Sequence, residues 1–389
     1  MISANHCVHN RHVRIAWDTT PLSVPPTGIG RYILGTLAAT AEARPEWDVR
    51  AVAVAEQTGI DRIAGSLASM PANVALRPMV KSPAWLTRRL ATDLGVRSLE
   101  RFSGDIDAFI DSEWFRPRQR GGVRLAIVYD VIPLLFPEWV SPRTRKAHLR
   151  SLKQIKDCAD HIVAISEATK RDLVEHLSIS AERISVAYPG VDATYTTAHA
   201  QPPSVVQGRP YVVVVGTTNA RKNLVRMLAA FAELAQSDAD LDLVVVGAAD
   251  ADEGAICAEV ERHGIANRVH RLGYVSDAEL AGIVAGARCL VFPSLYEGFG
   301  MPIVEAMAAG VPVAASANST LDEACGTAAV RFHPLDPAAM ATAISGLLSE
   351  STADRIEQGR RHAAGFTWSA AGEAIATAVE ATVREGRQD

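Results

Sequence analysis

Short runs of apolar, often β-branched residues alternate with longer segments of helical period along the whole chain. These runs predict strands, and the helical segments lie between them. Strands are expected at residues 13–18, 49–54, 107–111, 124–131, 161–165 and 184–188, and then at 211–215, 242–246, 269–272, 289–293, 312–315 and 328–332. Because strands buried on both faces read as continuous apolar runs separated by amphipathic helices, the pattern predicts an α/β fold with parallel sheets.

One stretch interrupts this alternation. Residues 192–209 contain Pro, Gly, Thr and Gln without periodicity, which is typical of an interdomain linker. We therefore expect two doubly wound domains, at residues 13–195 and 205–366. Helices are expected at residues 29–43, 143–159, 167–177, 222–236, 254–263, 276–286, 302–309, 338–348 and 368–385. The last helix is Ala-rich and is a candidate to pack back onto the first domain.

Length and composition favour the same organisation. A chain of 389 residues exceeds one ordinary core, and its 48% hydrophobic and 21% charged residues are typical of soluble globular proteins. The net charge is -5, but residues 1–200 hold 25 of the 39 basic and 21 of the 44 acidic residues, so they carry +4 and the remainder -9. A basic first domain suits peripheral contact with an anionic membrane, although solvated faces give similar imbalances. No nucleic-acid partner is expected.

The termini and the cysteines indicate the compartment. The first residues are polar and lack the apolar core of a signal peptide, and no apolar run reaches the ~20 residues that span a bilayer. Five scattered cysteines without CxxC spacing favour a reducing environment. We expect a cytoplasmic protein that could work at the inner face of the plasma membrane. Residues 81–101 form a basic amphipathic segment that suits either anionic lipid or a solvated helix face.

Residues 289–311 carry the most informative pattern. They read as a buried strand, a loop broken by Gly298 and Gly300, and a helix opened by Pro302. In open α/β sheets, ligands bind beyond the carboxyl ends of the strands, where loop amides and a helix amino terminus attract phosphate. Glu305 lies about one turn into this helix, where its two oxygens match the vicinal hydroxyls of a ribose.

Glu297 precedes this loop and could point into the cleft at a transferred sugar. The alternatives are that Glu305 only complements the helix dipole and that Glu297 is a solvated turn residue. Arg221 and Lys222 follow another strand, at the expected start of a helix, where cations oppose the dipole and need an anion. A diphosphate would supply that anion, and two solvated surface cations are the alternative.

Glu297, Glu305 and the residues between and after them, GFGMPIV and AMAAGVPV, resemble the E-x7-E motif of retaining glycosyltransferases of family 4, which have the GT-B fold. The resemblance implies two Rossmann-like domains facing each other across a cleft. It also implies that Glu305 binds the donor ribose and that Glu297 lies at the transferred sugar. Backbone amides of Gly298, Phe299, Gly300, Met301 and Pro302 would contact sugar and phosphate, and the basic pair would stabilise the leaving diphosphate.

The resemblance assigns further positions around the donor. Gly273, Tyr274 and Val275 become candidates for the base pocket, and Tyr274 could equally be ordinary packing. Gly28 and Gly30, in a loop before a helix, would approach the donor phosphate; a lone GxG does not support a dinucleotide site.

A further candidate follows a strand of the first domain. Asp130 lies at the end of a buried strand and is a candidate contact for an acceptor hydroxyl, or an Asp bonded to nearby amides. Tyr129 stands where relatives carry histidine. Ser166 resembles a serine motif of the family, but its role as a helix cap explains it.

Metal and cofactor signals are weak. Asp pairs in DxD spacing lie mostly in solvated turns, and the eleven histidines show no ligand spacing, so no metal and no cofactor are expected. The sequence therefore predicts a metal-independent hexosyltransferase that moves a sugar, with mannose from GDP-mannose as the first hypothesis, to a hydroxyl of a glycan or lipid-linked glycan. A sugar-nucleotide epimerase of the same architecture and a noncatalytic nucleotide- or glycan-binding protein are the alternatives.

Overall fold

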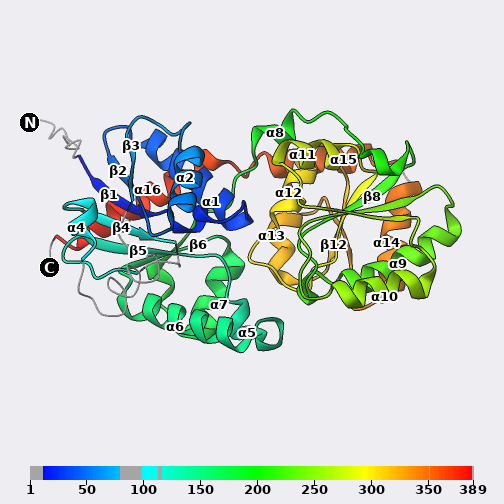
Figure 1. The fold of residues 1–389 in the computed structure, drawn as a ribbon, viewed down its shortest axis with the longest axis horizontal. Coiled ribbons are helices and arrows are strands. Elements are labelled where there is room, and N and C mark those ends of the chain that lie inside the picture. Colours follow the sequence, from blue (N-terminus) through cyan, green and yellow to red (C-terminus); the bar gives the residue numbers. More distant parts are fainter. Residues whose placement is uncertain (1–11, 79–97, 113–115, 350, 388–389) are drawn as a thin grey trace, which may run out of the picture.

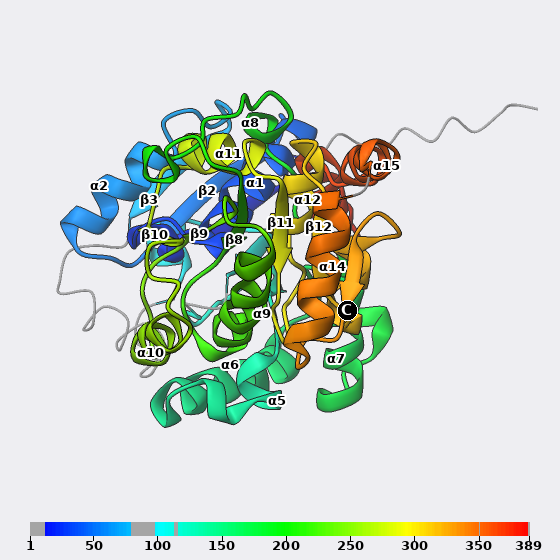
Figure 2. The same cartoon turned by 90° about the vertical axis from the view of Figure 1, so that its right-hand side faces the viewer.

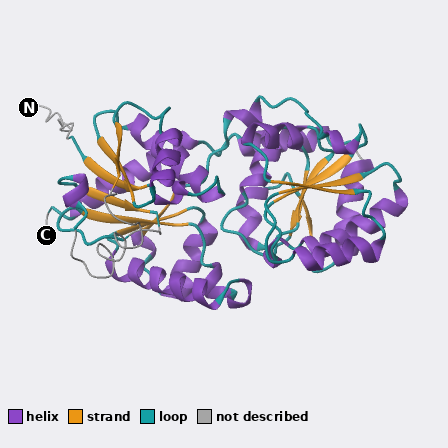
Figure 3. Cartoon of the chain, viewed as in Figure 1, coloured by secondary structure: helices purple, strands orange, loops and turns teal. Residues whose placement is uncertain are grey.

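The computed structural model describes residues 12–78, 98–112, 116–349 and 351–387. Each of two lobes is built on a sheet with helices on both faces (Figure 1, Figure 3). The first sheet has the order β3-β2-β1-β4-β5-β6-β7, and every pairing in it is parallel. Its strands are β1 (Arg14–Asp18), β2 (Asp48–Ala53), β3 (Val74–Pro78), β4 (Ala108–Asp111), β5 (Val123–Val128), β6 (His161–Ala164) and β7 (Ile184–Val186).

The second sheet is also parallel throughout and has the order β10-β9-β8-β11-β12-β13. Its strands are β8 (Tyr211–Val215), β9 (Asp242–Val246), β10 (Val269–Gly273), β11 (Cys289–Phe292), β12 (Val313–Ser316) and β13 (Val330–Phe332). In both sheets the strand order reverses beside the first strand, at β1 and at β8. Ligands of open α/β sheets bind at such switch points.

Alternate residues of the strands serve two cores. Val212 and Val214 of β8 pack with α9 and α14, whereas Val213 faces the opposite core, which contains α12. Figure 2 shows α9 and α14 side by side in front of the second sheet. The continuous apolar runs thus arise because both faces of each strand are buried.

The helices of the first lobe are α1 (Gly28–Ala43), α2 (Gln57–Ser66), α4 (Glu100–Ser103), α5 (Ile132–Leu135), α6 (Pro142–Cys158) and α7 (Glu167–Leu177). Those that follow are α8 (Ala193–Thr196), α9 (Leu224–Ser237), α10 (Glu253–His263), α11 (Asp277–Ala285), α12 (Met301–Ala308), α13 (Asp322–Cys325), α14 (Pro337–Ser349), α15 (Ala353–Ala363) and α16 (Trp368–Glu385). In the described parts of the chain, no helix combines the length and apolar character needed to span a bilayer.

The predicted α/β class and every predicted strand are confirmed. Of the described elements longer than four residues, three were not predicted. β3 is an edge strand whose last two residues are exposed, so it lacks a continuous apolar run. α2 and α15 are polar helices that bury few side chains. The predicted linker contains one turn of helix, α8, and a 3₁₀ turn, Ser204–Val206. Most of the basic segment 81–101 lies outside the described residues.

The chain crosses between the lobes twice, and α16 ends up against α1 of the first lobe (Figure 1). The two crossings touch, because the amide of Val191 donates to the carbonyl of Phe366 over 3.0 Å. Helices α1 and α16 approach closely at glycines. A Cβ on Gly35 would lie 2.3 Å from the Trp368 ring, and one on Gly372 would lie 2.5 Å from the carbonyl carbon of Ala39.

This contact predicts an unusual effect of a glycine substitution. Gly→Ala inside a helix normally stabilises by about 1 kcal/mol, but Gly372→Ala should lower the free energy of unfolding by ~1–3 kcal/mol because the methyl group overpacks the α1 interface. Gly346→Ala in α14 is the control, since a Cβ there meets nothing within 4 Å. It should stabilise by ~0.5–1 kcal/mol. Urea denaturation measures both, and a stabilised Gly372→Ala protein would contradict the close packing.

Candidate active site

A cavity of about 420 Å³ lies between the lobes, beyond the carboxyl ends of their central strands. Its lining residues follow β1, β5, β6 and β7 in the first lobe and end or follow β8 and β11 in the second, and include the first turns of α1 and α12. Of the residues predicted from the sequence, it is lined by Gly28, Asp130, Arg221, Lys222, Glu297, Gly298, Phe299, Gly300, Met301 and Pro302. The fold therefore brings together residues that are up to 274 positions apart, from Gly28 to Pro302.

The loop between β11 and α12 is fixed by its glycines. A Cβ on Gly298 would lie 2.0 Å from the carbonyl oxygen of Tyr129, so only glycine fits at this contact with the first lobe. The carbonyl of Gly298 accepts hydrogen bonds from Ser166 Oγ, over 2.5 Å, and from Thr169 Oγ1, over 3.3 Å. Gly300 has φ 105° and precedes the first residue of α12. The backbone thus reaches the cleft where the amino terminus of α12 begins.

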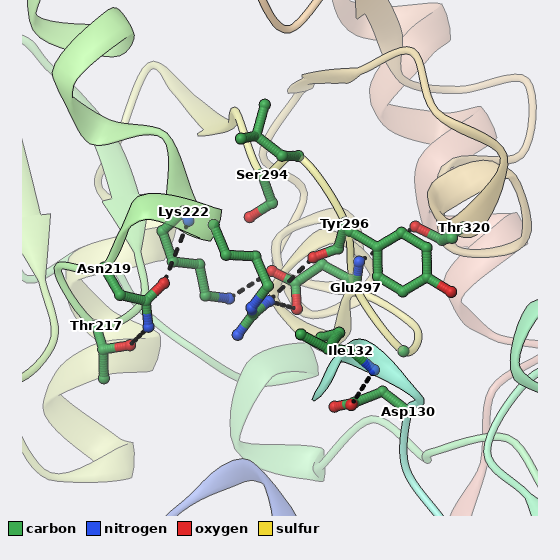
Figure 4. A network of polar contacts seen from close by, with 12 residues as sticks. Asp130, Ile132, Thr217, Asn219, Lys222, Ser294, Tyr296, Glu297 and Thr320 are labelled. Carbon is green, nitrogen blue, oxygen red and sulfur yellow. Dashed lines mark hydrogen bonds and ion pairs between the residues drawn. The ribbon is translucent and has the colours of Figure 1, made fainter. Parts of the chain in front are cut away.

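Glu297 forms ion pairs with both predicted cations. Its Oε1 lies 2.6 Å from Lys222 Nζ, and its Oε2 pairs with Arg221 Nη1. Figure 4 shows the ammonium group of Lys222 pointing at the carboxylate of Glu297. The side chain of Glu297 is only 11% exposed. Burial raises its pKa, but Lys222 and Arg221 lower it more strongly, to about 2, so the carboxylate is ionised at neutral pH.

The sequence suggested that the basic pair lies at the start of a helix, but the structure places it in a turn. Arg221 and Lys222 belong to a 3₁₀ turn, Ala220–Lys222, and α9 begins only at Leu224. Asn219 caps this turn, and its side chain accepts from the amide of Lys222. The anion that these two cations were expected to need is supplied in this structure by Glu297, and the contact with a donor diphosphate stays a prediction.

Asp130 follows β5 at the same cavity. Its Oδ1 accepts a hydrogen bond from the amide of Ile132 over 2.9 Å (Figure 4). Its charge also raises the pKa of Arg221, after the larger effects of burial and Glu297. Tyr129, which precedes Asp130, is buried, and its ring packs edge-on against Tyr32. The site therefore has a carboxylate here without an adjacent imidazole.

Glu305 lies beneath the cavity and not in its wall. Its side chain is 2% exposed, and its Oε1 pairs with Arg31 Nη2, which also lies 3.0 Å from Asp192 Oδ2. Burial raises the pKa of Glu305, and the charge of Arg31 opposes this effect. Arg31 lines the cavity, so the ion partner of Glu305 belongs to the cavity wall.

A second cavity of about 520 Å³ adjoins the first and shares Gly28 and Arg31 with it. Gly273, Tyr274 and Val275 line it from the second lobe, and residues 24–27 line it from the first. Most of its lining is apolar. Gly30 lines neither cavity. Its amide donates to Oγ1 of Thr27, which caps α1, over 3.1 Å.

Sequence reasoning missed several residues of this site. Arg31 directly follows the GIG loop, and a cation next to a glycine loop was a signal that could have been used. Ser166 caps α7 as predicted, since its Oγ accepts from the amide of Thr169, but it also holds Gly298. Thr320 Oγ1 accepts from the amide of Glu297 over 3.2 Å, and no local pattern links positions so distant in the sequence. Within the described residues, no group of three His, Cys, Asp or Glu side chains is arranged to hold a metal ion.

Two family models match the chain: "Glycosyltransferase Family 4" over residues 113–195 and "Glycosyl transferases group 1" over residues 197–362. The O-antigen chain mannosyltransferase B of Escherichia coli is 26% identical over 92% of this chain and 96% of its own length. An MMP alpha-(1->4)-mannosyltransferase of Mycolicibacterium hassiacum is 30% identical over 63% of this chain and 61% of its own length.

Solved glycosyltransferase structures have the same fold. HepE of Anabaena in complex with UDP and glucose superposes with a TM-score of 0.71 at 17% identity, and the match covers 95% of this chain and all of HepE. WaaG, a glycosyltransferase of lipopolysaccharide biosynthesis, superposes with a TM-score of 0.66 at 17% identity and covers 93% of this chain and 98% of its own. The predicted GT-B architecture is thereby confirmed.

The buried ion pairs of Glu297 predict a pH-dependent stability. Glu297→Gln leaves Arg221 and Lys222 buried without their carboxylate and should lower the free energy of unfolding by about 3–5 kcal/mol at neutral pH. The native pKa of about 2 lies below the ordinary value of 4.5. The contribution of the carboxylate is therefore complete above the ordinary value and is lost as the pH falls towards about 2.

Denaturant unfolding of wild type and Glu297→Gln across this acidic range measures the difference. It should shrink as the pH falls. Glu261→Gln, which removes an exposed carboxylate from the same lobe, is the matched control and should change stability little at any pH. A constant deficit for Glu297→Gln over the whole range would show that its charge does not stabilise the site.

Proposed function

We propose that the chain transfers mannose from GDP-mannose to a hydroxyl of a glycan or lipid-linked glycan, with retention of the anomeric configuration. The chain carries the family 4 and group 1 glycosyltransferase domains and therefore belongs to the glycosyltransferases with the GT-B fold. The observation that carries the proposal is the buried group of Glu297, Arg221 and Lys222 beside the glycine loop before α12, in a cavity between the lobes.

The donor diphosphate would lie along Gly298–Pro302 at the amino terminus of α12. Backbone amides and the helix dipole favour negative charge there. The base would occupy the apolar second cavity, beside Gly273, Tyr274 and Val275. The ribose would lie between these two positions. It would contact the carboxylate of Glu305 if Arg31 releases that carboxylate or continues to bind only one of its oxygens.

The chemistry follows from where charge develops. As the bond from sugar to phosphate breaks, negative charge grows on the departing diphosphate, and preorganised cations stabilise that charge. Glu297 keeps Arg221 and Lys222 in position before the donor arrives, and at the transferred sugar its carboxylate would face positive charge on the anomeric carbon. Lys222 and Arg221 would then divide their hydrogen bonds between Glu297 and phosphate oxygens. No metal ion is needed for this arrangement.

The acceptor would approach from the first lobe, where Asp130 is positioned to contact its hydroxyl group. A departing phosphate oxygen on the same face of the sugar would take the proton from that hydroxyl, which retains the anomeric configuration without a protein nucleophile. Mannose is proposed because two of the relatives that the chain resembles are named mannosyltransferases. A glycan acceptor is proposed because one of them is named for the O-antigen chain.

We further propose that the enzyme works in the cytoplasm at the inner face of the plasma membrane. The described support is helix α6, whose exposed side chains include Arg143, Lys146, Arg150, Lys153 and Lys156. A cationic surface of this kind is attracted to anionic lipid. The first lobe, which would receive the acceptor, is the lobe that carries this charge.

The donor assignment is tested by thermal unfolding with GDP-, UDP- and ADP-sugars. GDP-mannose should stabilise most, by about 2.7 kcal/mol at a concentration one hundred times its Kd, and free mannose should have no effect.

Turnover with a glycan acceptor should survive EDTA and should give the α-linked product by NMR. Incubation of the donor alone should return it unchanged. Stabilisation by none of the sugar nucleotides, or loss of turnover in EDTA, would contradict the proposal.

The ribose assignment is tested by pairing a side-chain change with a hydroxyl deletion. Wild type should bind GDP more tightly than 2′-deoxy-GDP by about 1–3 kcal/mol, because the Glu305 carboxylate would accept a hydrogen bond from the 2′-hydroxyl that the deoxy nucleotide lacks. Glu305→Gln should bind both more weakly and discriminate between them less. Asp192→Asn, which also disturbs Arg31, is the matched control and should discriminate as wild type does. Equal losses with both nucleotides would mean that Glu305 acts only through Arg31.

A further inference from the structure

A second concentration of positive charge lies in the first lobe. A groove of about 400 Å³ is lined by residues 116–122 and Arg124, which lead into and begin β5, and by Gln154, Cys158 and Asp160. Its wall thus contains the four arginines at positions 116, 118, 120 and 124 and a single carboxylate. None of these residues lines the two cavities at the cleft. The groove is therefore separate from the proposed donor site.

Arg116 forms the buried floor of this wall. Its side chain is only 9% exposed, its Nε lies 2.5 Å from Asp111 Oδ2, and its Nη1 donates to Ser151 Oγ over 2.6 Å. Its Nη2 is buried and has no hydrogen-bond partner in the described part of the chain. Buried donors are almost always satisfied in folded proteins, so this group needs an acceptor that the surrounding side chains do not provide.

Arg124 adds a second guanidinium group to this wall. Its Nη2 donates to the carbonyl of Pro117 over 2.8 Å, and its guanidinium lies 5.3 Å from the centre of the Phe109 ring. Burial lowers the pKa of Arg124; Asp111 opposes this, and the positive charge of Arg116 lowers the pKa further. Two like charges therefore share one buried carboxylate. The Asp160 carboxylate in the wall already accepts from the backbone amide of Arg124 over 2.7 Å.

We propose that this groove binds a phosphoryl group, in addition to any phosphate bound at the cleft. A phosphate offers several acceptor oxygens and up to two negative charges, which match the planar forks of neighbouring guanidinium groups. Arg116 and Arg124 would hold it from below, and the exposed Arg118 and Arg120 would close over it. The phosphate could belong to a phospholipid headgroup or to a soluble phosphate ester, since the recognition chemistry is the same.

The direct test is calorimetric titration of the full chain with inorganic pyrophosphate. Arg118→Gln/Arg120→Gln removes two exposed cations from the groove, and Arg143→Gln/Lys146→Gln removes two exposed cations of α6 that do not line it. The groove variant should bind about tenfold more weakly, whereas the α6 variant should bind as wild type does. Lys222→Gln weakens phosphate binding only at the cleft, so the groove component should persist in it. These titrations need no donor and no turnover, so their outcome does not depend on the transferase assignment.

Vesicles then identify the source of the phosphate. Flotation with phosphatidylcholine vesicles that contain phosphatidylglycerol, lost in the groove variant and reduced by added pyrophosphate, would assign a lipid headgroup. Pyrophosphate binding without flotation would assign a soluble phosphate ester. The proposal is overturned if wild type and the groove variant bind pyrophosphate equally, or if the only binding is abolished by Lys222→Gln.

Discussion

Three buried charges at the carboxyl ends of β8 and β11 determine how the second lobe is organised. Lys222 and Arg221 repel each other, and burial penalises the charge of both, so each depends on the carboxylate of Glu297 to offset this cost. Their joint requirement fixes the 3₁₀ turn after β8 and the loop after β11 relative to each other. The loop that leads to α12 therefore has a defined position before any ligand binds, and this is the kind of preorganisation on which electrostatic catalysis depends.

The same loop joins the two lobes, mainly through backbone groups. Ser166 and Thr169 donate hydrogen bonds to the carbonyl of Gly298. A second contact lies nearby in the fold, where the carboxylate of Glu323 accepts hydrogen bonds from the amides of Glu167 and Ala168, both over 2.8 Å, at the start of α7. Glu323 thereby satisfies helix donors that have no intrahelical partner. Because Gly298 lines the cavity, the hydrogen bonds that hold its carbonyl connect the geometry of the site to the closeness of the lobes.

Much of this architecture was predictable from the sequence because it depends on local pattern. A continuous apolar run such as YVVVV at β8 predicts a strand that is buried on both faces, and the glycines and Pro302 predict the turn into α12. The cavity between the lobes brings most of the predicted residues together, and their roles stay predictions. Arg31 and Thr320 were missed because their significance arises only when distant segments meet. Glu305 was expected to bind the donor ribose, which stays a prediction; its ion partner Arg31 comes from the other lobe, and no local pattern encodes that pairing.

The route of the chain through α16 has a mechanical consequence. The second lobe is tied to the first by two adjacent segments, joined by the bond from Val191 to Phe366, and the chain then ends in a helix packed on the lobe where it began. Two parallel tethers at one edge permit rotation about a single axis and resist twisting or sliding. Rotation about this edge would separate Arg31 from Glu305, because the two residues belong to different lobes and pair across the interface.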